Sequence, residues 1–132
     1  MGDLRERISN LGDDKDKVLA AVKHYCPAIE FVPDEFKKDR DFMLAVVKQC
    51  GYYGLMYADP ELRKDPEIVM KAVKKHGMAL EYADDELKKN KKIVMKAVKR
   101  NGLAFEYADP ELKKDRDFVM KAVKKGGDAL GY

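Results

Sequence analysis

A segment of about 25 residues recurs along this chain, and the recurrence constrains the fold more than any other feature. The copy that begins at Asp65 reads DPEIVMKAVKKHGMALEYADDELKK. Copies begin near residues 14, 39, 65, 90 and 115, and the fifth stops partway through the unit. Such a period is typical of helical solenoids, in which each unit buries its apolar side chains against its neighbours. Residues 1–132 are therefore predicted to form one domain, in which about residues 1–13 cap the first copy.

Each copy carries the start and stop signals of a helix. Asp65 is a good N-cap residue, and Pro66 suits the first helical turn. Val69 and Ala72 follow at helical spacing, with lysines on the opposite side. Gly77 is predicted to end this helix as a C′ glycine, and one or two shorter helical turns complete the unit. These signals predict an all-α fold: a tandem helical repeat in a short α-solenoid-like array with one continuous core.

The consensus also resembles a known family. Residues Asp65 to Ala83 follow the pattern D-x-E-I-V-x-x-A-V-K-x-x-G-x-A-L-x-Y-A, which resembles the tandem repeats called domain of unknown function 4116. The resemblance covers residues 14–132 and departs from the pattern in the first copy and beside Tyr53, where the second copy has one extra residue. That residue is predicted to form a bulge in a surface loop. The resemblance implies a helical repeat, and it implies no activity, cofactor or catalytic residue.

Charge and hydropathy narrow the classes of partner. The chain has 27 Lys and Arg against 24 Asp and Glu, so its net charge of +3 gives no strong overall bias toward nucleic acid or an anionic membrane. No apolar run has the length of a membrane span, and the N-terminal residues lack the apolar region of a secretory signal. An intracellular, by default cytoplasmic, location is expected.

The two cysteines, Cys26 and Cys50, lie about one repeat apart, so stacking brings them near each other and the spacing allows a disulfide. Free, partly buried thiols are the expectation, because nothing in the sequence indicates an oxidising compartment. With His24 and His76 they form the one metal-like grouping of the sequence. Equivalent positions in stacked helices lie about 10 Å apart, too far to share one zinc ion, so no metal site is predicted.

Catalysis is not expected, and no cofactor is predicted. The sequence has no glycine-rich phosphate loop and no nucleophile elbow, and its acidic residues recur with the repeat instead of converging at one place. One aromatic position is filled in every copy, and its residues are expected to pack half-buried in the core, although a stacking platform for bases is the alternative. The position is occupied by Phe31, Tyr57, Tyr82, Tyr107 and Tyr132.

The repeat architecture favours a non-enzymatic binding or scaffolding module with a protein partner, because stacked units make an extended surface that can vary copy by copy. Residues that break the repeat are the candidates for specificity. The predicted protein-binding residues are Tyr52, Tyr53 and Met56, beside the extra residue of the second copy.

Binding of nucleic acid or another polyanion is the alternative function. It would use the basic residues of the fourth copy, which are Lys91, Lys92, Lys96, Lys99 and Arg100. Elsewhere Glu67 with Lys71 and Asp117 with Lys121 are i,i+4 pairs expected to neutralise the lysines, whereas the fourth copy has Lys92 with Lys96. A solvated helix surface that is merely basic explains the same residues, and a purely structural or designed repeat without a partner is the third reading.

Overall fold

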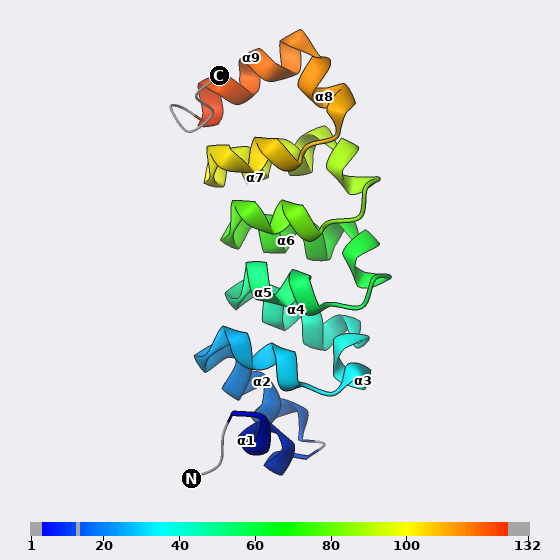
Figure 1. The fold of residues 1–132 in the computed structure, drawn as a ribbon, viewed down its shortest axis with the longest axis vertical. Helices are drawn as coiled ribbons and strands as arrows, with labels where there is room; N and C mark the ends of the chain where they lie inside the picture. Colours follow the sequence, from blue (N-terminus) through cyan, green and yellow to red (C-terminus); the bar gives the residue numbers. More distant parts are fainter. Residues whose placement is uncertain (1–3, 13, 127–132) are drawn as a thin grey trace.

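The computed structural model describes residues 4–12 and 14–126, and those residues form helices without a strand (Figure 1). Helix α1 (Leu4–Asn10) is followed by one long helix in each repeat, and the long helices lie one above another in chain order. They are α2 (Lys15–His24), α4 (Arg40–Gln49), α6 (Pro66–Lys75), α7 (Lys91–Arg100) and α9 (Arg116–Gly126). The predicted all-α array of tandem repeats is confirmed.

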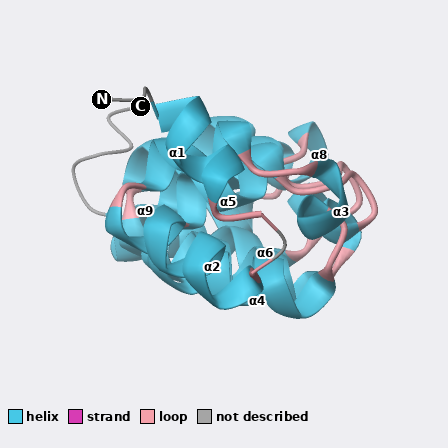
Figure 2. Cartoon of the chain, turned by 90° about the horizontal axis from the view of Figure 1, so that it is seen from below, coloured by secondary structure: helices cyan, strands magenta, loops and turns pink. Residues whose placement is uncertain are grey.

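Two shorter elements complete each unit. A short helix follows each of the first four long helices, and α5, η3 and η5 pack on the next unit's long helix as well as on their own. These elements are the 3-10 helices η1 (Cys26–Phe31), η3 (Gly77–Tyr82) and η5 (Gly102–Tyr107) and the α-helix α5 (Gly51–Tyr57). A last turn then leads to the next unit, and α3 and α8 gather at one edge of the stack in Figure 2. These turns are α3 (Asp34–Lys37), η2 (Leu62–Lys64), η4 (Leu87–Lys89) and α8 (Pro110–Lys114).

Every long helix begins at a side-chain cap. In each case the side-chain oxygen of the cap accepts a hydrogen bond from the backbone amide three residues later, which satisfies a donor that the first turn leaves free. The capping residues are Asp14, Asp39, Asp65, Asn90 and Asp115.

The glycine that recurs in the unit does not have the role that the sequence predicted. Helix α6 ends at Lys75, and its C-cap residue His76 is extended at φ −138°. Among the described residues, Gly12 is the one with a positive φ. A Cβ on Gly51 would lie 2.5 Å from the carbonyl oxygen of Ala72 in the next unit, and a Cβ on Gly77 would collide with that of Ala97. Gly77 therefore follows the C-cap residue as predicted, but it lacks the left-handed conformation of a C′ glycine and serves close approach between units.

The core runs through the stack as one cluster. Four residues of α6 and four of α7 belong to this core, and none of them is more than 1% exposed. These residues are Ile68, Val69, Ala72 and Val73 in α6 and Ile93, Val94, Ala97 and Val98 in α7. In the first copy Lys17 replaces this isoleucine and is exposed, so the first unit has the more polar outer side expected of a terminal repeat.

The extra residue of the second copy lies inside a helix. Helix α5 has seven residues in α conformation, whereas η1, η3 and η5 have six residues each in 3-10 conformation. An α-helix rises about 1.5 Å per residue and a 3-10 helix about 2.0 Å, so seven residues of the first span nearly the length of six of the second. The predicted loop bulge is wrong because a change of helix type absorbs the residue.

Polar contacts between units repeat as regularly as the core. The backbone amides of Asp59, Asp84 and Asp109 donate to carbonyl oxygens of the preceding unit at 3.0–3.1 Å. A basic residue at the start of one long helix also pairs with the capping aspartate of the next. These pairs are Lys15 with Asp39, Arg40 with Asp65 and Lys91 with Asp115. Pro66 carries no charge at this position, and there the next cap is the neutral Asn90. No helix of the described residues is long and apolar enough to cross a membrane.

Candidate functional site

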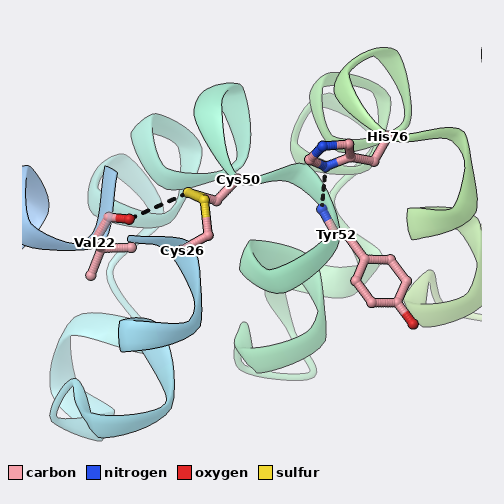
Figure 3. The surroundings of a disulfide bond; sticks show 5 residues. All are labelled: Val22, Cys26, Cys50, Tyr52 and His76. Carbon is pink, nitrogen blue, oxygen red and sulfur yellow. Dashed lines mark hydrogen bonds between the residues drawn. A yellow bond between two sulfur atoms is a disulfide. The ribbon is translucent and has the colours of Figure 1, made fainter. Parts of the chain in front are cut away.

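The first two units are joined by a disulfide between Cys26 and Cys50 (Figure 3). Cys26 stands where other copies have glycine, and the close approach at that position brings the two Cα atoms to 5.6 Å, within the range that a disulfide requires. Cys50 is fully buried, and its Sγ lies 3.5 Å from the carbonyl oxygen of Val22. The expectation of free thiols is wrong. Because the bond occupies both sulfurs, neither thiolate is available to a metal, and the described residues hold no group of three potential ligands.

The next junction uses a hydrogen bond at the equivalent place. The backbone amide of Tyr52 donates to Nδ1 of His76 at 3.0 Å, as Figure 3 shows. Nδ1 must be unprotonated to accept this bond. Partial burial lowers the pKa of His76, and the positive charges of Lys75 and Arg100 lower it further. The side chain of His76 keeps an exposed surface and acts as a polar contact between units.

The side chain of Tyr52 lies against the next unit. Its hydroxyl is 3.2 Å from the hydroxyl of Tyr82 and donates to Glu81 at 3.3 Å, and the rings of Tyr52 and Tyr82 meet edge to face at 5.2 Å. The hydrogen bond with Tyr82 raises the pKa of Tyr52 most, and burial of the hydroxyl raises it further. Of the predicted protein-binding residues, Tyr53 is 37% exposed, whereas Tyr52 and Met56 are half-buried. Their role in binding stays a prediction, and Tyr53 is the one that offers most surface.

The repeated aromatic position lies at the margin of the core. Phe31, Tyr57, Tyr82 and Tyr107 are half-buried and pack against the buried cluster. Cationic side chains cover two of these rings, with Arg5 at 5.3 Å from the centroid of Phe31 and Lys37 at 5.3 Å from that of Tyr57. Tyr132 lies outside the described residues. Among the described residues, the rings at this position therefore do not form a row of free faces on which bases could stack.

Four of the five predicted anion-binding residues lie together. They line a hollow of about 460 Å³ on the outer side of α6, α7 and α9. We call this hollow the lysine groove, and its lining residues are Met70, Lys91, Lys92, Met95, Lys96, Lys99, Phe118 and Lys121. Arg100 lies elsewhere: its Nε donates to the carbonyl oxygen of Lys75 at 3.1 Å, and it lines a separate cavity beside His76.

The lysine groove is poorly neutralised. Lys91 pairs with Asp115 at 3.3 Å, while the other four lysines of the groove make no ion pair with any described residue. Neither predicted i,i+4 pair is within ion-pair distance. Glu67 pairs with Arg40 of the preceding unit instead of Lys71, and Asp117 makes no ion pair with Lys121. Lys92 also reverses the charge that the other copies have at its position, which is Asp16, Asp41, Glu67 and Asp117. The basic character of the fourth copy is therefore concentrated at one place.

The family comparison agrees with this repeat architecture. The model of the family described as Domain of unknown function (DUF4116) matches residues 14–63, 52–88, 65–112 and 90–132. The chain belongs to this family. Three of the DUF4116 matches begin at Asp14, Asp65 and Asn90, which are capping residues of long helices. No curated protein and no solved structure matches the chain.

The sequence of this DUF4116 chain indicated the lysines of the lysine groove that lie on α7, but not the residues that neighbouring units contribute to it. Met70 comes from the third copy, and Phe118 and Lys121 come from the fifth. A signal for them existed, because Met70 and Lys121 occupy the same positions of the repeat as Met95 and Lys96. Positions that are equivalent in consecutive copies lie side by side in a stack.

Proposed function

We propose that this DUF4116 chain is a non-enzymatic binding module that holds an acidic segment of another protein in the lysine groove. The observation that carries the proposal is the gathering of five lysines from two successive units around one hollow, with a single acidic partner in reach among the described residues. Like charges held on a rigid stack repel one another, and an acidic ligand relieves that repulsion when it binds.

A protein partner is favoured over nucleic acid by what lies between the lysines. The groove contains the thioether side chains of Met70 and Met95, which adapt to apolar side chains of different shapes. Its one aromatic residue, Phe118, is 5% exposed and offers no face on which a base can stack. Nucleic-acid binding is the second candidate, because lysines alone suffice for contacts to phosphate.

The deciding experiment compares two labelled polyanions by fluorescence anisotropy, poly-glutamate and duplex DNA of equal charge, over a range of salt concentrations. We expect poly-glutamate to bind more tightly than the duplex. The double variant Lys92→Glu/Lys96→Glu should weaken its binding by at least about tenfold, because two contacts become repulsive. Tighter binding of the duplex, with a log-log salt slope of about −0.9 per phosphate contact, would favour the second candidate.

A matched control separates the groove from net charge. Lys48 and Lys74 are exposed and make no ion pair with a described residue, and they occupy the repeat position of Lys99 in the second and third copies. The double variant Lys48→Glu/Lys74→Glu changes the net charge equally and should alter the affinity by less than about twofold. Equal losses in the two double variants would contradict a localised site. The Tyr53→Ala variant tests the aromatic patch in the same assay and should bind poly-glutamate normally.

A further inference from the structure

We infer that the lysine groove binds an amphipathic acidic helix whose apolar side chains contact the methionines while its carboxylates meet the lysines on either side. The inference rests on the proposed function and specifies how the acidic segment is held. It adds an apolar contribution to binding and a helical shape for the ligand. Binding by charge alone requires neither.

The apolar contribution is indicated by a row of methionines across three units. Met70, Met95 and Met120 occupy the same position of the repeat on α6, α7 and α9. Met70 and Met95 are half-buried in the groove, and Met120 is 60% exposed beyond it. Unbranched thioether side chains in a row are typical of surfaces that accept apolar side chains of a partner helix. The row therefore extends the binding surface past the hollow itself.

The spacing of that row fits a helix that runs along the stack. Packed helices lie about 8–10 Å apart, so successive methionines are separated by about one such step. Residues seven apart on a helix point the same way and are separated by about 10.5 Å. A partner helix with apolar residues at i, i+7 and i+14 therefore places one of them on each of Met70, Met95 and Met120.

The width of the groove also fits a helix. Lys92 and Lys99 lie on the two sides of Met95, seven residues apart on α7, which is about 10.5 Å along the helix axis. A helix with its side chains has a diameter of about 10–12 Å, so acidic residues that flank its apolar stripe reach the lysines on both sides. An extended segment points its side chains alternately to two opposite faces, so when one face contacts the methionines the other points away from the groove.

The test uses the full chain and two synthetic peptides of about 18 residues, a length that spans three units as a helix. The first peptide has leucine at three positions seven apart and glutamate at the flanking positions. The second has serine in place of each leucine and the same net charge. Titration calorimetry measures affinity, and circular dichroism of the mixtures measures the helix content of the bound peptide.

We expect the leucine peptide to bind at least about tenfold more tightly than the serine peptide and to gain helix content on binding. The variant Met70→Gln/Met95→Gln keeps the size of both side chains but makes them polar, and it should abolish most of that difference. The control variant Met78→Gln changes a half-buried methionine of η3 that lines a different cavity, and it should leave the difference intact. Thermal unfolding of each variant confirms that it folds.

The outcomes separate this inference from the proposed function. Equal binding of the two peptides, with loss in Lys92→Glu/Lys96→Glu, leaves the acidic-segment function standing and overturns the apolar contribution. Tight binding of the leucine peptide without a gain of helix content overturns the helical shape. Failure of both peptides to bind at about 1 mM, which corresponds to a binding free energy weaker than about −4 kcal/mol, overturns the inference together with the function.

Discussion

Replacing Gly77 with alanine tests whether close approach between units sets the geometry of the stack. The added Cβ would meet the carbonyl oxygen of Ala97 and would lie 3.0 Å from the backbone nitrogen of Asn101, and both atoms belong to the main chain of the next unit. Main-chain atoms in a hydrogen-bonded helix end cannot rotate away, so the two units must move apart. Such overpacking costs about 1–3 kcal/mol, and alanine recovers about 0.5–1 kcal/mol by restricting the unfolded chain.

We expect Gly77→Ala to lower the free energy of unfolding by about 1–2 kcal/mol, measured by denaturant unfolding followed by circular dichroism. Gly77→Asn is the discriminating control. Asparagine tolerates a left-handed C′ position, so it would be the milder change if Gly77 had that role. The larger side chain should instead destabilise the stack at least as much as alanine does. A Gly77→Ala variant as stable as the parent, or an asparagine variant milder than alanine, would refute the close-approach argument.

Three further perturbations probe the contacts between units. Reduction of the Cys26–Cys50 disulfide, which joins residues 24 apart in sequence, should lower the free energy of unfolding by about 3 kcal/mol, and equal denaturation midpoints with and without reductant would contradict this. Asp65→Ala removes a helix cap and an ion pair and should cost about 1–2 kcal/mol, whereas Asp65→Asn keeps the cap and should cost less than about 1 kcal/mol, as urea titration can measure. The pKa of His76 is lower in the folded chain than in the unfolded chain, so the unfolded chain takes up a proton first as the pH falls below about 6.5. The contribution of neutral His76 to stability is therefore complete above that pH and is lost as the pH falls through the folded-state pKa. A pH series of unfolding curves should show this loss, and His76→Gln, which has no titrating imidazole, should not.

The helical frame could be predicted because each unit carries its own local signals. Asp65 and Pro66 mark a helix start without reference to any other unit, and Ile68 and Val69 lie on the face that the stack buries. The number and order of units followed from the period alone. Local chemistry therefore determines the units, and their repetition determines the array.

The contacts between units were harder to predict, because they depend on distances that a single unit does not contain. The Cys26–Cys50 bond forms because the short helix of one unit lies close to the end of the next unit's long helix, and the spacing in sequence allowed pairing without requiring it. Gly77 illustrates the same difficulty. Its place after a helix suggested a terminating conformation, but its lack of a side chain leaves room for the carbonyl oxygen of Ala97, twenty residues further along the chain.

Departures from the repeat fall into two classes that the structure separates. At Cys26 and Tyr52 the copies differ, yet the side chain of each residue makes a contact with the following unit, so these positions serve the stack. Lys92 departs in another way: it replaces an acidic residue with a basic one at an exposed position and makes no ion pair with any described residue. Because this change adds no ion pair among the described residues and gathers charge beside Lys96 and Lys121, we propose that it serves a ligand outside the chain. The lysine groove, and not the irregular second copy, is for this reason the place where binding should be sought.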